Sequence, residues 1–355
     1  MDYFFTQAMT EICEHSLVAP GYPLHCLIIV NPAAGGFVIK KRWERRVKIL
    51  KEYQKKARAN PKRQMHKNMI ISLTEGKGSA VEITKSFVSR AEKDHVPFYL
   101  IISAGGDGTH LEIMLTLYDV PAHIRRSIAV LKLPMGTGND GSDGVHLNQA
   151  LDLLIKPTHI EYASAVQLIT KHEGSSKWKG PFLAFNIVSI GLDAFVSQMT
   201  NTMKEKFPGD SYRFWVDVAT LSYERKYKVD YIDIKAFDDK NNEIASFSEK
   251  FLLFAMGVSG RRTYGSQQHI LPDDRNVCGV KQMSFLNKLS LKGQFARGKH
   301  IKSPKAILLN AHRLEITCRQ PILAQMDGEA VLLQPDDFPA IMEITPPVIP
   351  LLKFN

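Results

Sequence analysis

The sequence has few cysteines, and their spacing suits neither a disulfide scaffold nor a zinc site. The four are Cys13, Cys26, Cys278 and Cys318, and no two of them form a C-x-x-C pair. Zinc sites and thiol redox motifs usually carry such closely spaced pairs. The spacing therefore argues against both kinds of site and fits a reducing cytoplasm.

Long apolar runs are also missing. No stretch reaches the roughly 20 apolar residues that a helix needs to cross a bilayer. The first 15 residues, MDYFFTQAMTEICEH, lack a basic segment followed by an apolar one, so no secretory signal is expected. With 44% hydrophobic and 23% charged residues, the composition is that of a globular protein. We expect a cytoplasmic protein of two domains.

Several catalytic motifs are absent. There is no G-x-x-x-x-G-K-[ST] P-loop and no H-R-D or D-F-G set, which argues against P-loop ATPases and protein kinases. Ser259 follows Gly257 and Val258 and precedes Gly260, which is not the G-x-S-x-G elbow of a hydrolase. The 12 histidines show no convincing metal spacing, and no helix-turn-helix, zinc-finger or aromatic RNA motif favours a nucleic-acid partner.

Basic residues are in excess, with a net charge of +10 and a pI near 9.3. Much of the excess falls in residues 40–67, KKRWERRVKILKEYQKKARANPKRQMHK. A run of this kind is typical of a solvated helix face followed by a loop. It also suits a landing patch for an anionic membrane, where each Lys or Arg contributes about 1 kcal/mol. Composition leaves both interpretations open.

The first third of the chain alternates apolar strand-like runs with segments of helical periodicity. This alternation predicts a mostly parallel sheet with helices on both faces. A further helix is expected at residues 147–155. The expected strands are residues 24–30, 69–73, 98–103 and 128–133, and the expected helices are residues 39–57, 78–92 and 111–118.

The pattern changes near residue 155, where short apolar runs separated by turn residues take over. These runs predict an antiparallel sandwich or barrel, interrupted by helical segments at residues 196–206 and 212–227. We therefore expect a first domain of residues 1–155, which residues 338–355 could complete, and a second domain of residues 156–337. The expected strands are residues 165–170, 181–189, 229–237, 251–258, 306–309, 313–318 and 322–326.

Three of the first four strands end in loops that are rich in glycine. The strongest is residues 104–109 (AGGDGT), because successive amides and a following helix N-terminus form an anion site. Asp107 in this loop suits a place beside Mg²⁺ or a proton to be moved, or else a plain helix N-cap. Residues 136–140 (GTGND) and 31–36 (NPAAGG) follow neighbouring strands. Ligands of such sheets bind at the carboxyl ends of the strands, so the three loops predict one site.

Together with residues 327–329 (DGE), these loops resemble the diacylglycerol kinase catalytic-domain family, which includes bacterial lipid kinases and the sphingosine and ceramide kinases. The likeness runs from about residue 24 to about residue 333. Residues 186–194 (NIVSIGLDA) are similar to the segment that opens the family's second domain, and residues 210–227 to its long helix. NAD kinases share the GGDGT loop, whereas GTGND and DGE favour lipid kinases.

The resemblance implies an α/β nucleotide-binding domain, a β-sandwich, and an active site between them. It implies an ATP-dependent lipid kinase that phosphorylates diacylglycerol or a related lipid, with Mg²⁺ on the phosphates. It also implies peripheral association with the inner face of the membrane, and it leaves a homodimer open. By the same likeness, Asp327, Asp107 and Glu329 are the candidate catalytic residues, and Glu112 matches a common family glutamate. The candidate nucleotide-binding residues are Asn31, Gly35, Gly36, Thr74, Gly105, Gly106, Gly108, Thr109, Gly136, Thr137 and Asn139.

The sequence departs from the family pattern at four places. Ala34 replaces a serine that contacts phosphate, and residues 141–143 (GSD) replace Phe-Ala-Arg. Residues 264–267 (YGSQ) replace a tyrosine followed by three glycines. Residues 273–279 (DDRNVCG) lack a later carboxylate, so the family's structural Mg²⁺ is in doubt and no metal ligand is assigned.

Two alternatives keep the same fold. One is a kinase for a soluble substrate, related to NAD kinases. The other is a non-catalytic nucleotide or lipid sensor. Retention of Asp107, Glu112 and Asp327 argues against the sensor, which needs no base.

Overall fold

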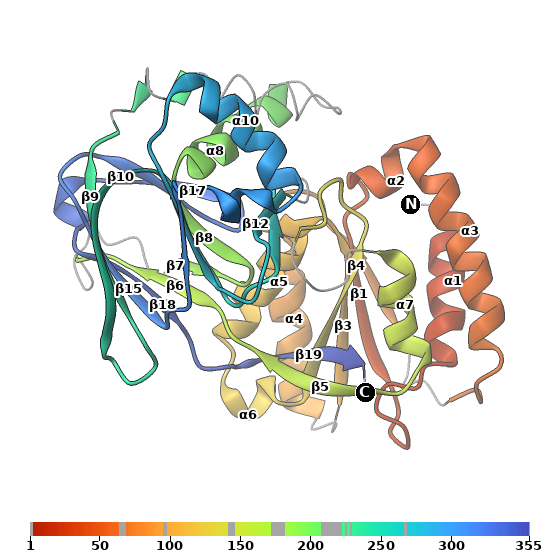
Figure 1. The fold of residues 1–355 in the computed structure, drawn as a ribbon. Coiled ribbons are helices and arrows are strands. Elements are labelled where there is room, and N and C mark those ends of the chain that lie inside the picture. The colour runs from red at the N-terminus through yellow and green to blue at the C-terminus, as the bar shows by residue number, and fades with distance from the viewer. Residues whose placement is uncertain are drawn as a thin grey trace. The chain divides into compact units, whose positions relative to one another are not determined.

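The structure is a computed structural model that describes residues 3–63, 69–94, 98–140, 146–171, 182–206, 222–223, 226–227, 229–265 and 268–354. The chain forms two compact units, coloured along the sequence in Figure 1. Unit 1 is Met1–Ala163 with Pro347–Asn355, and unit 2 is Ser164–Pro346. The sequence placed the boundary at residue 155 instead. The contacts place it after Ala163, because residues 158–163 form a strand of the first sheet.

Unit 1 contains a six-stranded sheet in the order β2-β1-β3-β4-β19-β5. All neighbouring strands are parallel except β5, which pairs antiparallel with β19. The strands are β1 (His25–Val30), β2 (Ile70–Leu73), β3 (Tyr99–Gly105), β4 (Ile128–Pro134), β5 (Thr158–Ala163) and β19 (Ile349–Phe354). The helices are α1 (Tyr3–Glu14), α2 (Gly35–Val38), α3 (Lys40–Ala57), α4 (Ser79–Asp94), α5 (Asp107–Tyr118), α6 (Ala122–Arg125) and α7 (Leu147–Ile155).

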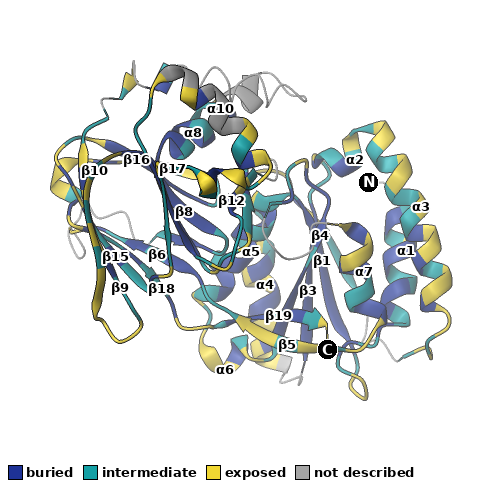
Figure 2. Cartoon of the chain, in the orientation of Figure 1, coloured by how far each residue is buried: buried dark blue, intermediate teal, exposed yellow. Residues whose placement is uncertain are grey.

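Helices cover both faces of this sheet, which explains why β1 and β3 are buried at every position and mostly apolar (Figure 2). On one face, α1, α3 and α7 pack against alternate residues of β1, β3 and β4, in a core that includes Phe5, Ile28 and Leu50. The other face carries α4 and α5 (Figure 1). The sequence did not predict α1, although Phe5, Ala8, Met9, Ile12 and Cys13 give it a buried stripe at helical spacing.

Unit 2 contains a large, curled antiparallel sheet. The long strand β10 pairs with β9 along its first half, and its second half pairs with β8 and β13, so that one strand runs through both layers. A core that includes Val188, Phe254 and Ile316 fills the space between the layers. The strands of unit 2, with a separate β11-β12 hairpin, are β6 (Val166–Ile169), β7 (Phe182–Ala184), β8 (Ile187–Gly191), β9 (Tyr231–Phe237), β10 (Glu243–Gly257), β11 (Arg262–Tyr264), β12 (Gln268–Leu271), β13 (Val277–Lys281), β14 (Ala306–Leu309), β15 (Arg313–Cys318), β16 (Ile322–Met326), β17 (Glu329–Leu333) and β18 (Ala340–Ile344).

The helices of unit 2 are α8 (Leu192–Lys206) and α10 (Phe285–Ala296), with short 3-10 helices η1 (Lys299–Lys302) and η2 (Pro335–Asp337). The predicted fold class, a mostly parallel α/β domain plus an antiparallel β-domain, is confirmed. Most of the helix predicted at residues 212–227 lies outside the described residues. Among the helices that the structure describes, none is long and apolar enough to span a membrane.

Candidate active site

Three loops of unit 1 meet at the carboxyl ends of β1, β3 and β4. Each loop is hydrogen-bonded to the next. The Asn31 amide donates to the Ala104 carbonyl at 3.0 Å, and the Met135 amide donates to the Gly105 carbonyl at 2.9 Å. The Gly36 backbone amide donates to the Met135 carbonyl at 2.7 Å, which joins the loop after β1 to the loop after β4. The loops that the sequence singled out therefore form one surface, as the parallel topology requires.

The loops lie so close together that several of their glycines leave no room for a side chain. A Cβ atom at Gly136 would lie 2.6 Å from the Gly106 Cα, and one at Gly35 would lie 2.5 Å from the Thr137 Oγ1. A Cβ at Gly108 would meet no atom within 4 Å. Gly35 and Gly136 thus serve loop packing, whereas the backbone at Gly108 has open space beside it that a ligand could fill.

The N-terminus of α5 points into this loop surface. Gly106 is the N-cap residue and supplies no side-chain cap, so the first-turn amides of Asp107, Gly108 and Thr109 have no partner within the helix. Asn31 Nδ2 donates to Thr109 Oγ1 at 3.2 Å and fixes the turn from the β1 side. Unpaired amides at the positive end of a helix dipole bind anions such as phosphate.

Asp107 is not an N-cap; its side chain forms an ion pair. Lys132 Nζ of β4 donates to Asp107 Oδ1 at 2.6 Å and to the Asp140 carbonyl at 3.0 Å. A Cβ at Gly138 would lie 3.3 Å from Asp107 Oδ2 and 3.4 Å from Asp140 Oδ2, so the two carboxylates flank one point. The sequence analysis missed Lys132, which lies within an otherwise apolar strand.

Two arginines of α3 lie beside the loop after β1. Arg46 donates from Nη2 to the Pro134 carbonyl at 2.7 Å, and Arg42 Nη1 would lie 3.5 Å from a Cβ at Gly35. Burial, with a smaller contribution from neighbouring Arg42, lowers the pKa of Arg46. The Arg46 guanidinium therefore places positive charge next to the loop after β4. The basic run suggested these arginines only as part of a surface.

Thr74 and Glu112 lie near the loops but make contacts that support them. Thr74 is buried, and its amide donates to the Val30 carbonyl at 2.8 Å. Glu112 accepts from the Gly78 amide at 2.8 Å and from the Ala80 amide at 3.2 Å, which satisfies the N-terminus of α4. Glu112 therefore ties α5 to α4.

In unit 2, the turn between β16 and β17 holds Asp327 in a fixed orientation. Its backbone is left-handed, with φ of +46°. Its carboxylate accepts hydrogen bonds from three successive amides: Phe185 at 2.6 Å, Ile187 at 2.9 Å, and Asn186 at 3.1 Å and 3.2 Å. Glu329 is exposed two residues later, at the start of β17.

A buried polar network lies next to this turn. The side-chain Nε2 of Gln325 donates to Ser189 Oγ at 2.8 Å, and Ser189 Oγ donates to Asp193 Oδ2 at 2.6 Å. Gln325 Oε1 accepts from the Gly328 amide at 2.9 Å, which joins the network to the Asp327 turn. The sequence analysis marked the segment of Ser189 and Asp193 only as a family likeness and missed Gln325.

Two of the four departures from the family pattern fall wholly or partly outside the described residues. Residues 141–143 and 266–267 lie outside the described residues. Asp273 pairs with Arg275, and Asp274 pairs with Arg261 at 2.6 Å, so guanidinium groups bind both carboxylates. Within the described ranges, no three His, Cys, Asp or Glu side chains are grouped to hold a metal.

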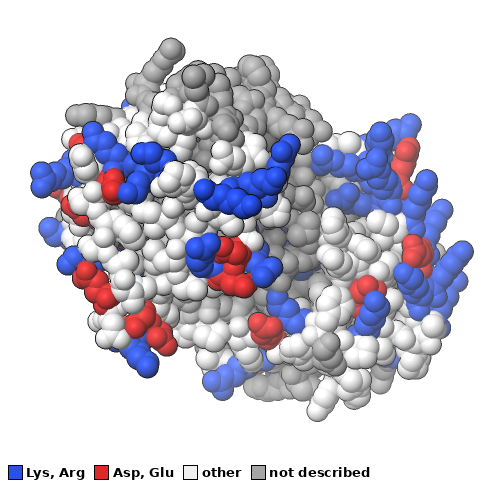
Figure 3. Space-filling model, viewed as in Figure 1, with Lys and Arg blue, Asp and Glu red and all other residues white. Residues whose placement is uncertain are grey.

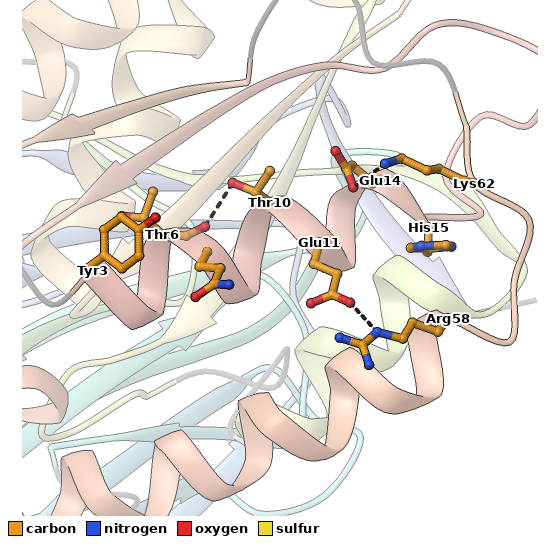
Figure 4. A pocket seen from close by; sticks show the side chains of 9 residues that line it. Tyr3, Thr6, Thr10, Glu11, Glu14, His15, Arg58 and Lys62 are labelled. Carbon is orange, nitrogen blue, oxygen red and sulfur yellow. Dashed lines mark hydrogen bonds and ion pairs between the residues drawn. The ribbon is translucent and has the colours of Figure 1, made fainter.

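An open groove of about 560 Å³ lies elsewhere on unit 1, along α1 (Figure 4). Thr6, Thr10, Glu11 and Glu14 line it from α1, opposite Arg58 and Lys62. Arg58 pairs with Glu11, and Lys62 pairs with Glu14 at 3.1 Å. None of the lining residues belongs to the three loops.

Two family models match successive parts of the chain. Residues 25–170 match the diacylglycerol kinase catalytic domain, and residues 186–353 match the YegS C-terminal NAD kinase beta sandwich-like domain. No curated protein matches the chain significantly.

Two solved structures, each described as a "putative diacylglycerol kinase" from Bacillus anthracis str. Sterne, are similar in fold. The first is 20% identical with a TM-score of 0.59, over 96% of this chain and 98% of that one. The second is 19% identical with a TM-score of 0.56, over 93% of this chain and 97% of that one.

Proposed function

Because the chain belongs to the diacylglycerol kinase catalytic-domain family, we propose that it is an ATP-dependent lipid kinase acting at a membrane surface. The acceptor is the hydroxyl of diacylglycerol or a related lipid. The observation that carries the proposal is the loop surface at β1, β3 and β4, where the first-turn amides of α5 have no partner within the helix and the glycine-rich loops lie beside them. Phosphoryl transfer depends mainly on positioning and on neutralising phosphate charge, and both needs are met by such amides.

The loop surface suits the phosphates of ATP. Gly108 leaves space beside the first-turn amides, and Arg42 and Arg46 supply positive charge next to the loop after β1. Arg46 is held in place by its bond to the Pro134 carbonyl, so it is ordered before a nucleotide binds. A preordered cation loses little entropy on binding, which favours its use at a phosphate site.

The donor set around Gly138 fits Mg²⁺. The carboxylates of Asp107 and Asp140 both lie beside Gly138, and Mg²⁺ is commonly held by one or two carboxylates together with nucleotide phosphates. When bound, the ion neutralises charge on the phosphates. Asp107 and Asp140 would hold it, and the ion pair with Lys132 fixes the Asp107 carboxylate.

Asp327 is the proposed proton acceptor for the lipid hydroxyl, with Glu329 beside it. The three amides that bind Asp327 hold its carboxylate in one orientation. Asp327 would both orient the lipid hydroxyl and take its proton as the bond to phosphorus forms.

The experiment that tests the proposal is transfer of labelled phosphate from ATP and Mg²⁺ into a panel of lipids in mixed micelles, with NAD as a soluble acceptor. Label in one lipid class would support the proposal and name the substrate. Label in NAD alone would replace it with the soluble-substrate kinase. Intact ATP binding without any transfer would favour the sensor.

A further inference from the structure

Lys132 is an unusual residue for its place in the fold. It lies in β4, a strand whose other residues are buried and apolar, and it pairs in register with the buried Ser103 of β3. Its side chain is only 11% exposed. A nearly buried ammonium is costly unless it is paired, so its partners indicate why it is there.

The two groups that Lys132 bonds to, the Asp107 carboxylate and the Asp140 carbonyl, belong to the candidate phosphate loops. The ammonium lies 2.6 Å from Asp107 Oδ1, at the start of α5, and 3.0 Å from the Asp140 carbonyl, at the end of the loop after β4. One side chain therefore links the two loops that follow β3 and β4. Neither bond is made to a residue of a neighbouring strand.

The ion pair also decides which oxygen of Asp107 is available. Oδ1 is bound by the ammonium, while Oδ2 lies beside Gly138. Rotation of the Asp107 carboxylate would break a charge-assisted hydrogen bond, which is about twice as strong as a neutral one. Lys132 thus fixes the orientation of the Asp107 carboxylate.

We infer that Lys132 is a positioning residue that acts through Asp107, fixing its Oδ2 toward the Mg²⁺ of a bound Mg²⁺–ATP complex. This inference rests on the proposed use of Mg²⁺–ATP, but not on the identity of the acceptor. The sequence gives no signal for it, because one lysine in IAVLKLP looks like an exposed strand position.

The test compares Lys132→Met, Lys132→Arg, Asp107→Asn and the double variant Lys132→Met/Asp107→Asn. Lys156→Met is the matched control, because Lys156 also pairs with an aspartate of unit 1, Asp152, but lies on the surface beyond α7. The measurements are ATP binding by calorimetry as a function of Mg²⁺ concentration, kcat and KM for ATP, and thermal unfolding.

Lys132→Met is expected to lower kcat at least about tenfold and to change the Mg²⁺ concentration for half-maximal ATP binding. Lys132→Arg should restore part of the loss. With Asp107→Asn already present, Lys132→Met should add less than about threefold, because residues that act as a unit are not additive.

Three results would overturn the inference. One is a Lys132→Met protein that behaves like Lys156→Met. Another is the same loss from Lys132→Met with or without the Asp107 carboxylate. The third is equal loss of thermal stability, Mg²⁺-independent ATP binding and kcat, which would make Lys132 a structural link only. If the wild type transfers no phosphate to any acceptor, the proposed function fails, and the Mg²⁺ dependence of ATP binding still tests Lys132.

Discussion

At the scale of single residues, Asp327 has two proposed roles, one in proton transfer and one in holding the backbone of unit 2. The family likeness assigns it the hydroxyl proton, while the structure gives its carboxylate three backbone donors. Asp327→Asn should lower phosphate transfer at least about 100-fold, the usual range for a lost acid or base. ATP affinity should stay within about twofold, because the candidate nucleotide residues all lie in unit 1.

The same substitution should also cost stability in unit 2. An asparagine amide nitrogen cannot accept from a backbone N–H, so one of the three donors loses its partner, at a cost of about 1–3 kcal/mol. Urea unfolding measures this loss, and Asp239→Asn, at an exposed carboxylate of unit 2, is the control with no expected change. Asp327→Asn with normal transfer would remove Asp327 from the chemistry.

His300 should make the stability of unit 2 depend on pH. The ring is fully buried, packs on Phe295 at 4.2 Å between ring centroids, and lies 3.1 Å through Nε2 from the Ile270 carbonyl. Burial lowers the pKa of His300 to about 4, from 6.5 in the unfolded chain. The unfolded state therefore binds the proton more tightly, so stability is complete above pH 6.5 and is lost as the pH falls toward 4.

The expected loss attributable to this group between pH 7 and pH 4 is about 3 kcal/mol. His300→Gln should flatten that part of the pH profile in denaturant titrations at several pH values. The other titratable groups remain in both proteins, so the difference between the two profiles isolates His300. Identical slopes for both would contradict the assignment.

At the scale of elements, the glycines of the three loops differ in how much space surrounds them. Gly136→Ala would force a Cβ to within 2.6 Å of the Gly106 backbone, so we expect both stability and ATP binding to fall. Gly108→Ala meets no protein atom and lies in the first turn of α5, so it should stabilise the protein by up to about 1 kcal/mol.

ATP binding by Gly108→Ala is nevertheless expected to weaken at least about tenfold, because a methyl group would fill the space beside the phosphate amides. Thermal unfolding and calorimetry separate the two effects. A more stable Gly108→Ala protein with unchanged ATP affinity would move the phosphates away from the N-terminus of α5.

Helix α3 carries the basic surface that the sequence suggested for membrane contact, and Figure 3 shows Lys and Arg gathered along this part of unit 1. The inner face of α3 contains the buried side chains of Leu50 and Tyr53. Its outer face carries the exposed Lys41, Arg45 and Lys48 at helical spacing. Farther along, Arg58 and Lys62 are paired with acidic residues of α1. We propose that anionic lipid binds the outer face of α3 rather than the segment after it.

Changing Lys41, Arg45 and Lys48 together to Glu should weaken binding to vesicles containing phosphatidylserine at least about tenfold, since each basic residue contributes about 1 kcal/mol. The matched control changes the exposed Lys240, Lys302 and Lys305 of unit 2 to Glu, which alters the net charge equally. Vesicle sedimentation at low and moderate salt measures both. Equal weakening in the two proteins would mean that net charge alone controls binding.

At the scale of the whole molecule, the sequence predicted the fold class and the three loops because their signals are local. Apolar runs followed by glycines mark β1, β3 and β4, and parallel topology then brings their ends together. Lys132 and Gln325 could not be predicted, because their partners come from other elements and single polar residues in strands are usually exposed. The first half of β10, EIASFSEK, is largely exposed and polar, so only its buried second half was predicted.

Strands β5 and β19 escaped prediction for a related reason. β5 (THIEYA) is largely exposed, and β19 contains Pro350. The two strands lie far apart in the sequence and pair with each other, so neither is marked as a strand by its own residues. Deletion of residues 347–355 should therefore leave β4 and β5 with unpaired edges and destabilise unit 1 selectively. Hydrogen exchange should show lost protection in β3 and β4 and retained protection in β9 and β15; uniform protection would contradict this.

The position of β19 also orders events on the ribosome. The strand that separates β4 from β5 is translated only after all of unit 2. Domains generally fold in the order of their synthesis. The sheet of unit 1, however, lacks the strand between β4 and β5 until unit 2 has been translated. Until β19 pairs, the free edge of β4 is open to any edge strand nearby, so the growing polypeptide should depend on holdase chaperones until β19 leaves the ribosome.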